Sequence, residues 1–406
     1  MASFKNFEVD GDGVNCWGHS AALLERARRL HDPPNVTMDG HNDLPWSLHE
    51  INGHRLSAPG LDLREPQHAI HRKELRHLYL HTDFPRCEKG GLTAQFWSVY
   101  VPTQIRGDGA VQKTLEQIDV VHRLCEKYAD KMAFAWSAAD VRRIVADGRL
   151  ASMCGVEGGH QINGSLATLR MYHRLGVRYM TLTHNGGPGW ADAALDENAK
   201  YNEHATAGGL SAFGVEVVKE MNRVGMAVDV SHVHADTMRK AIAVSRAPVI
   251  FSHSNTRAVC NHPRNVPDDV LLSLNEFDGV VMININAPFI AGDFFVSGGK
   301  VGATIKEVAD HIDHAKKVTG NCLRVGLGAD YDGIKSPSRG MEDVSTYPVL
   351  TAELLSRGYT DAEIIAINGG NVLRVLEKIE KVAAEMQASG VLASEARPED
   401  FGEVAL

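Results

Sequence analysis

Short apolar runs alternate with amphipathic helical stretches along most of this sequence, and this alternation constrains the fold more than any other feature. The runs expected to form strands cover residues 35–38, 92–101, 150–156, 177–183, 226–231, 248–252, 279–285 and 323–329. The helical stretches expected around them cover residues 112–128, 166–175, 213–224, 235–244, 266–275, 305–318 and 360–387. Strict alternation of strand and helix implies a parallel sheet. Eight repeats favour an α/β fold of the closed (β/α)8 TIM barrel type over an open doubly wound sheet.

The chain has the size and composition of one globular domain. At 406 residues, with 44% hydrophobic and 23% charged residues, it can bury a large core. We expect a single domain over residues 1–406, with its barrel core at about 35–385. Residues 1–34 are expected to form an N-terminal arm with a helix at 19–31, and residues 386–406 a C-terminal extension over the surface. A loop-rich insertion is expected before residue 91.

Charge and targeting features narrow the range of partners. A net charge of -9 and the lack of a Lys/Arg block argue against a nucleic-acid partner. No stretch approaches the ~18 to 20 apolar residues of a membrane span, and the first residues lack a secretory signal. We therefore expect a cytoplasmic protein without a membrane partner. The six cysteines are scattered without a Cys-x-x-Cys pair, which predicts free thiols.

Potential metal ligands or acid/base groups stand at the carboxyl ends of six of the eight expected strands. They are His41 and Asp43, Glu157, His184, His232, His253 and Asp330. Any one of them alone is more often a hydrogen-bonded loop residue than a ligand. Active sites of such barrels lie at the carboxyl ends of the strands, so these side chains are expected to converge. Converging carboxylates and imidazoles would repel or desolvate one another without a cation, which favours a divalent-metal site.

Seven motifs lie at or near these strand ends. They are Asp-Gly-His-Asn-Asp-Leu-Pro at 39–45, Gly-Val-Glu-Gly-Gly-His at 155–160, Leu-Thr-His-Asn at 182–185, Asp-Val-Ser-His at 229–232, Ser-His-Ser-Asn at 252–255, Arg-Asn-Val-Pro-Asp at 264–268 and Gly-Ala-Asp-Tyr-Asp-Gly at 328–333. In this order, over about residues 36–377, the chain resembles the renal (membrane) dipeptidase family of the metal-dependent amidohydrolase superfamily. The resemblance implies a zinc-dependent dipeptidase on a (β/α)8 barrel, with two Zn²⁺ ions per chain at the C-terminal face.

The resemblance also implies the metal ligands. His41 and Asp43 match the ligands of one zinc, His232 and His253 match those of the second, and Glu157 matches the carboxylate that bridges both. These residue types are suitable zinc ligands, and a carboxylate can span two ions ~3.5 to 4 Å apart. The expected nucleophile is a metal-bridged hydroxide that attacks the peptide carbonyl.

Three residues take catalytic or substrate-binding roles by the same resemblance. Asp330 is expected to take the proton from the bridging water and deliver it to the departing amine. Asp332 is a rival two positions later, and we favour Asp330. His184 is expected to face the substrate and stabilise the oxyanion of the tetrahedral intermediate. Arg264 is expected to bind the free carboxylate of the substrate, which suits a planar guanidinium.

The expected substrate is a small dipeptide, and the family's dimers make a homodimer the first expectation. Cys-Gly units of glutathione-derived conjugates in secondary metabolism are one possible substrate class. Another amidohydrolase activity on the same metal site, as an N-acyl amino acid deacylase or a lactonase, is the alternative. A binding protein that retains metal without catalysis is disfavoured, because Glu157, His184 and Asp330 are all intact.

Overall fold

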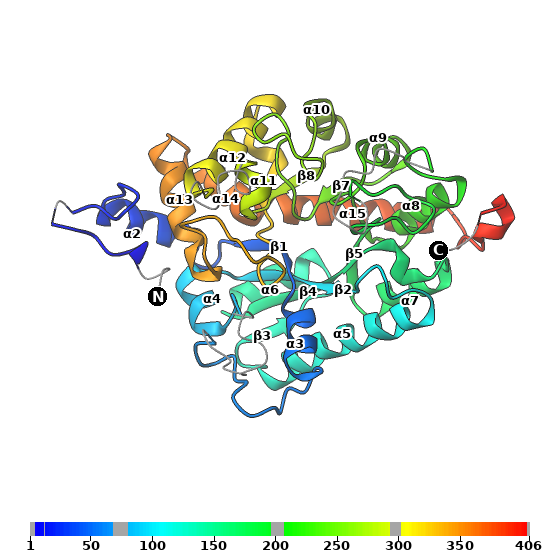
Figure 1. Ribbon diagram of the computed structural model, residues 1–406, viewed down its shortest axis with the longest axis horizontal. Helices are drawn as coiled ribbons and strands as arrows, with labels where there is room; N and C mark the ends of the chain where they lie inside the picture. The colour runs from blue at the N-terminus through cyan, green and yellow to red at the C-terminus, as the bar shows by residue number, and fades with distance from the viewer. Residues whose placement is uncertain (1–4, 12, 68–79, 196–206, 293–301, 404–406) are drawn as a thin grey trace.

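The computed structural model describes residues 5–11, 13–67, 80–195, 207–292 and 302–403 (Figure 1). Positions 1–4 and 12 of the predicted N-terminal arm, 68–79 of the predicted loop-rich insertion and 404–406 of the predicted extension lie outside the described residues. Within the described ranges, no helix has the length and apolar character that a membrane crossing requires.

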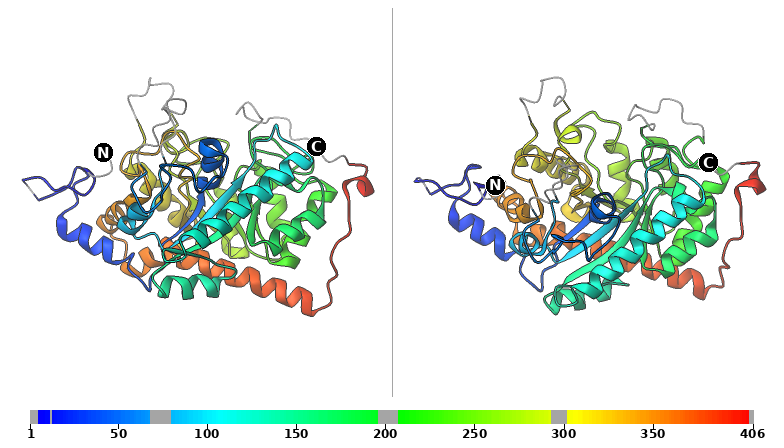
Figure 2. Two further views of the ribbon diagram at one scale, coloured as in Figure 1. Left: turned by 90° about the horizontal axis from the view of Figure 1, so that it is seen from below. Right: turned by 60° about the horizontal axis from the view of Figure 1, so that its bottom comes forward.

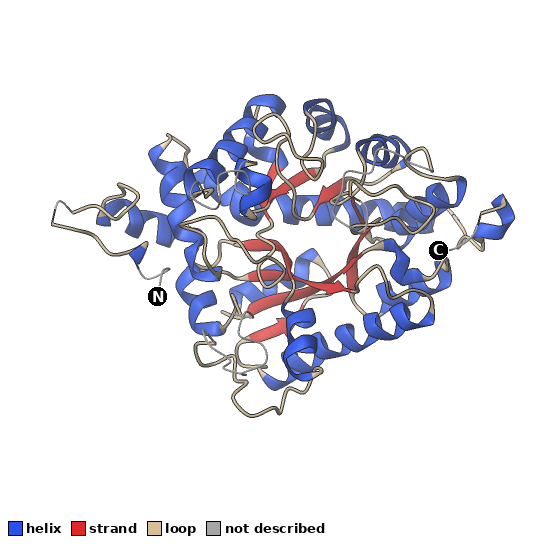
Figure 3. Cartoon of the chain, viewed as in Figure 1, coloured by secondary structure: helices blue, strands red, loops and turns tan. Residues whose placement is uncertain are grey.

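Parallel strands form a closed barrel at the centre of the molecule, and helices surround it (Figure 3). The strands are β1 (Met38–Asn42), β2 (Ala94–Tyr100), β3 (Met132–Phe134), β4 (Leu150–Glu157), β5 (Val177–Thr181), β6 (Ala227–Asp229), β7 (Val249–Phe251), β8 (Val280–Ile283) and β9 (Val325–Leu327). Their order is β2-β1-β9-β8-β7-β6-β5-β4-β3, and the ring closes where β2 pairs with β4, from Ala94 opposite Ala151 to Tyr100 opposite Glu157. The predicted (β/α)8 barrel is confirmed.

The short strand β3 is an addition that the apolar pattern does not predict. It pairs with the start of β4, with Met132 opposite Leu150 and Phe134 opposite Ser152. Three residues are too few to show a two-residue period, so this strand has no sequence signal of its own. The strand β1 also begins later than expected, which places His41 inside the strand.

Helices cover the outside of the barrel and one of its ends. They are α2 (Ala21–Arg29), α3 (Leu44–Asn52), α4 (Phe84–Gly90), α5 (Asp108–Lys127), α6 (Ala138–Ala146), α7 (Leu166–Arg174), α8 (Ala212–Val224), α9 (Ala235–Val244), α10 (Asp268–Phe277), α11 (Ala287–Ala291), α12 (Ile305–Thr319), α13 (Tyr347–Ser356), α14 (Asp361–Ile365) and α15 (Asn371–Ala388). Local signals fix their starts: Ser165 caps α7, Ser211 caps α8, and Thr304 forms a capping box with Glu307 at α12. The long helix α15 lies along one side of the molecule in both views of Figure 2.

Side chains along the strands alternate between the barrel interior and the helix layer. Phe96, Met153 and Tyr179 belong to the cluster that fills the barrel, and Trp97 and Val99 pack in the outer cluster with the helices. The inner cluster also contains one face of α15, which therefore covers the amino ends of the strands. The carboxyl ends of the strands stay available for the polar residues that follow them.

The two terminal segments pack at opposite ends of the long axis (Figure 1). The helix α2 packs against α13. After α15 the chain runs over α7 and α8 to a 3-10 helix (Pro398–Phe401). Arg170 donates to the carbonyl of Ser394 at 2.8 Å, and Ser211 Oγ donates to Glu403 Oε2 at 2.5 Å. These contacts hold the C-terminal segment on the helix layer, away from the strand ends.

Candidate metal centre

The carboxyl ends of the strands bring the predicted ligands into one cluster around Glu157. Oε1 of Glu157 lies 3.4 Å from His41 Nε2, 3.1 Å from His232 Nε2 and 3.5 Å from His253 Nε2. His41 Nε2 is also 3.4 Å from an Asp43 oxygen, and the Nε2 atoms of His232 and His253 are 2.8 Å apart. All five residues are buried. One oxygen of Glu157 is therefore shared between the His41–Asp43 pair and the His232–His253 pair.

Two of these histidines are oriented through their Nδ1 atoms. Nδ1 of His41 lies 2.8 Å from the Tyr179 hydroxyl, and Nδ1 of His253 lies 2.8 Å from Ser252 Oγ. Metal-binding histidines are commonly held by such a second partner, which fixes the ring and its tautomer. Both contacts leave Nε2 directed at Glu157.

Left-handed backbone conformations turn two further side chains toward the centre. His232 has a φ of 64° and Asp330 a φ of 69°, which residues other than glycine seldom adopt. Nδ1 of His232 lies 3.2 Å from Asn185 Oδ1. Asn284 Nδ2 donates to Asp330 Oδ2 at 3.0 Å. Neighbouring amides thus hold both residues in these conformations.

The charges of the cluster suit a cation. Burial lowers the pKa of His184, His232 and His253 well below the ordinary value, and the positive charge of Arg264 acts in the same direction. The imidazoles of His184, His232 and His253 are therefore neutral, as metal ligands must be. At His41, burial is outweighed by Tyr179, Glu157 and Asp43, which raise its pKa well above the ordinary value. Burial raises the pKa of Asp330 well above its ordinary value, and the nearby carboxylates add to the rise. A bound cation would relieve this repulsion.

Two buried atoms of the cluster that make no hydrogen bond also fit a divalent metal. His41 Nε2 and Asp43 Oδ1 have no hydrogen-bond partner among the described residues. A buried polar group without a partner costs about 1–3 kcal/mol, so these atoms are expected to bind something. Three overlapping groups have their ligand atoms within 4.8 Å of one another: His41–Glu157–His253, Glu157–His184–His232 and His41–Asp43–Asp330. Imidazole nitrogens with carboxylate oxygens suit zinc and related ions.

Asp330 and Asp332 face different neighbours. Asp330 Oδ1 lies 3.9 Å from His41 Nε2, beside the ligand cluster. Asp332 Oδ1 accepts from the backbone N–H of His81 at 2.6 Å, and the Asp332 N–H donates to His81 Nδ1 at 2.8 Å. Asp330, the predicted proton carrier, therefore lies beside the ligand cluster, whereas the alternative candidate, Asp332, is hydrogen-bonded to His81 in a neighbouring loop.

A cleft of about 790 Å³ adjoins the cluster. His184 and Glu157 line it, together with the aromatic residues Trp46, Tyr100 and Phe289. His184 Nε2 lies 3.8 Å from Glu157 Oε1. A substrate in this cleft would contact the ligand cluster on one side and aromatic side chains on the other.

Arg264 lies beside the cleft but not in its lining. The residue is 1% exposed, and its guanidinium donates to the carbonyl of His253 at 3.3 Å and to Ser254 Oγ at 3.4 Å. The ring of Phe289 lies over the guanidinium, with Cζ 5.4 Å from the ring centre. Burial lowers the pKa of Arg264 to about 10, so the group remains charged at neutral pH. The guanidinium is thus covered in this structure and does not open onto the cleft.

The residues that support the ligands carry no clear signal in the sequence. Tyr179 and Ser252 lie within expected strands, and Asn185 and Asn284 lie at or just after strand ends. A polar or aromatic side chain within a few positions of a strand end is the signal that could have found them. His160, by contrast, directs Nε2 to the carbonyl of Val101 at 3.1 Å and belongs to none of the ligand groups of the described residues.

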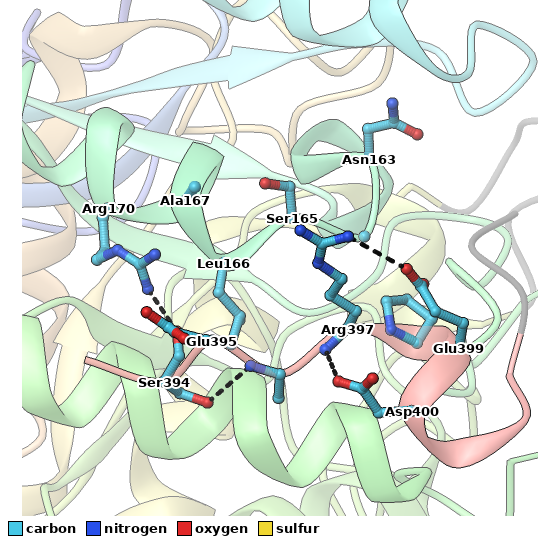
Figure 4. A pocket seen from close by; sticks show the side chains of 13 residues that line it. Asn163, Ser165, Leu166, Ala167, Arg170, Ser394, Glu395, Arg397, Glu399 and Asp400 are labelled. Carbon is cyan, nitrogen blue, oxygen red and sulfur yellow. Dashed lines mark hydrogen bonds and ion pairs between the residues drawn. The ribbon is translucent and has the colours of Figure 1, made fainter. Parts of the chain in front are cut away.

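A second hollow, of about 890 Å³, lies between α7 and the C-terminal segment (Figure 4). Both of its arginine side chains are already paired. Arg170 bonds to Glu220 at 2.9 Å, and Arg397 Nη1 lies 3.7 Å from Glu399. The ligand groups found in the described residues do not include its lining residues, so the chemistry belongs to the cleft at the strand ends.

Comparisons with known proteins agree with a metal centre of this kind. Residues 24–390 match the sequence profile of the family described as Membrane dipeptidase (Peptidase family M19). The chain belongs to this family. Dipeptidase aclJ of Aspergillus oryzae is 41% identical over 369 residues, which cover 89% of this chain and 82% of the relative. Dipeptidase 3 of Mus musculus is 40% identical over 361 residues, which cover 89% of this chain and 67% of the relative.

Solved structures share the fold of this M19 dipeptidase. The probable dipeptidase PvdM from Pseudomonas aeruginosa has a TM-score of 0.76 at 21% identity, covering 89% of this chain and 99% of that one, and this likeness concerns the fold alone. A metallo peptidase from Rhodobacter sphaeroides, liganded with a phosphinate mimic of the dipeptide L-Ala-D-Ala, has a TM-score of 0.70 at 25% identity and covers 85% of this chain and 99% of that one. The chain is a metallo-dipeptidase, and its substrates are dipeptides.

Proposed function

We propose that this dipeptidase binds two zinc ions, one through His41 and Asp43 and the other through His232 and His253, with Glu157 shared between them. The observation that carries the proposal is the position of Glu157 Oε1, which lies 3.4 Å, 3.1 Å and 3.5 Å from the Nε2 atoms of the three histidines. This approach of one carboxylate to ligands of both pairs supports a bridging role for Glu157.

The zinc ions would supply Lewis-acid activation of the scissile carbonyl and of the attacking water. Asp330 receives a proton from that water and passes it to the departing amine. Its Oδ2 is fixed by Asn284 at 3.0 Å, which leaves Oδ1 directed at the ligand cluster. One fixed and one free oxygen suit a group that must accept a proton and then donate it.

His184 and Arg264 bind the substrate in this proposal. His184 lines the cleft, and its neutral imidazole can donate an N–H to the oxyanion of the tetrahedral intermediate. Arg264 binds the free carboxylate of the dipeptide through its planar guanidinium. Its buried positive charge, next to the His253 carbonyl and beneath the ring of Phe289 at the edge of the cleft, supports this role.

We further propose that the substrates include Cys-Gly units of glutathione-derived conjugates. A cleft of about 790 Å³ is large for a dipeptide alone and falls in the range that holds a drug-sized ligand. Its aromatic side chains, Trp46, Tyr100 and Phe289, could pack against an apolar group attached to the cysteine sulfur.

A panel of substrates tests this proposal with zinc-reconstituted protein. The panel contains Cys-Gly, an S-alkylated Cys-Gly, Leu-D-Ala, Gly-x dipeptides, an N-acyl amino acid and a lactone. We expect cleavage of the dipeptides, with a higher kcat/KM for S-alkylated Cys-Gly than for Gly-x. Cleavage of the N-acyl amino acid or the lactone without cleavage of any dipeptide would reject it.

We also propose that the protein is a homodimer, as the family resemblance implies. Exposed apolar side chains support association: Trp136 is 45% exposed, Met171 43% and Leu175 40%. Light scattering that gives the mass of one chain at micromolar concentration would reject the dimer. The cytoplasmic location expected from the sequence stays a prediction.

A further inference from the structure

A second group of potential metal ligands lies outside the catalytic centre, where the end of α3 packs against α5. It consists of His49 on α3, His54 just after α3, and Glu116 on α5. Their candidate ligand atoms lie within 4.8 Å of one another. We propose that His49, His54 and Glu116 form an additional zinc site, separate from the catalytic metal centre.

His54 is held in a form that suits a ligand. Its ring is buried, at 8% exposure, and Nε2 lies 3.0 Å from the carbonyl oxygen of Pro45. A carbonyl only accepts, so Nε2 carries the proton and Nδ1 keeps its lone pair. A backbone carbonyl is a common second partner of metal-binding histidines. The first ligand of the proposed site is thus already in the required tautomer.

The end of α3 fixes the position of this ring. Gly53 and His54 both have a φ of 62°, so two successive residues are left-handed. The Gly53 N–H donates to the His49 carbonyl at 2.8 Å and the His54 N–H to the Leu48 carbonyl at 3.3 Å, which closes the helix end. A left-handed histidine is uncommon and here folds the ring back beside α3. The centres of the His54 and His49 rings are 4.8 Å apart.

The other two ligands have the freedom to close around an ion. His49 and Glu116 are half-buried on neighbouring helices. Ligands of a tetrahedral zinc, each about 2.0–2.1 Å from the metal, are roughly 3.4 Å from one another, so small side-chain movements complete the site. Burial lowers the pKa of His54 to about 4 and also lowers that of His49, so both rings are neutral at pH 7. Water completes the coordination.

Two neighbouring positive charges, those of Lys113 and of Arg123, oppose the ion. Arg123 donates to the His54 carbonyl at 3.3 Å. Lys113 Nζ lies 3.6 Å from Glu116 Oε2, and Gln112 donates to Glu116 Oε1 at 2.8 Å. Zinc must displace or share these contacts. We therefore expect binding in the micromolar range, weaker than at the fully buried catalytic centre.

The proposed site touches the wall of the catalytic cleft through Trp46. The Trp46 ring centre is 4.8 Å from that of His49 and 5.4 Å from that of Tyr100. Trp46 lines the cleft, and α3 begins directly after Asp43. A paramagnetic or heavy ion bound by His49 would therefore quench the fluorescence of Trp46.

The experiment uses the full-length enzyme with its catalytic centre saturated with zinc. Calorimetric titration with further Zn²⁺ should reveal one additional site per chain. His49→Gln and Glu116→Gln should each weaken this site at least tenfold without lowering the content of tightly bound zinc. His314→Gln is the matched control, because His314 also lies beside a carboxylate, 2.8 Å from Asp268, on a distant helix. Both variants in the site replace half-buried side chains and leave His54 and its helix end intact.

Cu²⁺ quenching of tryptophan fluorescence gives a second measurement. We expect saturable quenching in the wild type that is lost in His49→Gln and in Trp46→Phe. The proposal is overturned if the wild type binds no additional zinc, if His49→Gln and Glu116→Gln bind it as the wild type does, or if His314→Gln alone abolishes it.

Discussion

At the scale of single residues, the centre depends on side chains that hold the ligands as much as on the ligands themselves. Tyr179 is an example. Its hydroxyl bonds to His41 Nδ1 at 2.8 Å and donates to the carbonyl of Gly40 at 3.2 Å, so one phenol fixes both the ring and the strand end. An added side chain at Gly155 would overlap the Tyr179 ring, which explains why glycine stands opposite it in the next strand.

Replacing Tyr179 tests this support. We expect Tyr179→Phe to keep the fold and to weaken metal binding roughly 10- to 100-fold, as the loss of such an outer partner commonly does. Metal affinity is measured by competition with a chromophoric chelator. Tyr128→Phe is the matched control, since it removes a buried phenol that accepts from the Leu63 N–H at 3.1 Å far from the ligands. Equal affinity in Tyr179→Phe and the wild type would contradict the role.

Replacing Asp330 should affect catalysis and not metal binding, because Asp330 is the proposed proton carrier. Asp330→Ala should keep the fold and the bound metal and lower kcat by about 10²- to 10⁴-fold, the usual contribution of a general acid–base group. Circular dichroism, metal analysis and dipeptide hydrolysis are measured together. Asp269→Ala, which removes an exposed carboxylate paired with Arg239, should hydrolyse dipeptides normally. Near-normal turnover by Asp330→Ala would remove Asp330 from the mechanism.

Sequence predicts the residues at the centre better than the contacts among them. The five ligands all lie within the last two positions of a strand or within three positions after it, so a barrel fold alone brings them together. They are His41, Asp43, Glu157, His232 and His253. The side chains that hold these ligands could not be predicted in the same way. Tyr179, for example, lies 138 positions from His41, and an aromatic residue is common in any strand.

At the scale of elements, the sequence predicts helices and strands with a strong periodic pattern but not those that are very short or buried on all sides. The helix expected at 235–244 is found as α9 (Ala235–Val244). The short helix α6 (Ala138–Ala146) and the strand β3 lie in a stretch to which the apolar pattern assigns no element. The helix α13 (Tyr347–Ser356) is buried along nearly all of its residues, so it lacks the polar face that reveals a surface helix.

His31 connects α2 with the segment before β1 and with α13, and its burial should make the free energy of unfolding depend on pH. It follows α2, and its ring nitrogens lie 2.8 Å from the hydroxyls of Thr37, before β1, and Thr351, in α13. Burial lowers its pKa to about 3. Between this pKa and the unfolded value of about 6.5, only the unfolded chain takes up the proton. The contribution of His31 to the free energy of unfolding is therefore complete above pH 6.5. Below pH 6.5 it falls by about 1.4 kcal/mol for each pH unit, down to the folded-state pKa.

The pH dependence of the wild type is compared with that of His31→Gln, whose side chain can keep a hydrogen bond but cannot titrate. Between pH 7.5 and pH 5, the wild type should lose about 2 kcal/mol more unfolding free energy than the variant. Urea unfolding followed by circular dichroism at both pH values gives the difference. His314→Gln should follow the wild type. The assignment to His31 is wrong if the His31 variant and the wild type have the same pH dependence.

At the scale of the whole molecule, the barrel brings together ligands that are up to 212 positions apart, from His41 to His253 (253 − 41). Pairing between β2 and β4 makes this possible, since it closes the sheet into one ring. The long helix α15 closes the amino end with apolar side chains, and the cleft stays at the carboxyl end. The fold class is thus predictable from the alternation of strands and helices. The shape of the cleft is not, because it depends on loops whose lengths and contacts give no periodic pattern in the sequence.

The central claim, a catalytic centre of two zinc ions shared by Glu157, is tested most directly by the metal content after zinc reconstitution and dialysis. The measurement uses the His49→Gln background, so that the additional outer site does not contribute. We predict two tightly bound zinc ions per chain, a loss of at least one of them in Glu157→Gln, and dipeptidase activity that disappears with a chelator and returns with zinc. One zinc ion or none per chain, with activity unaffected by the chelator, would contradict the account.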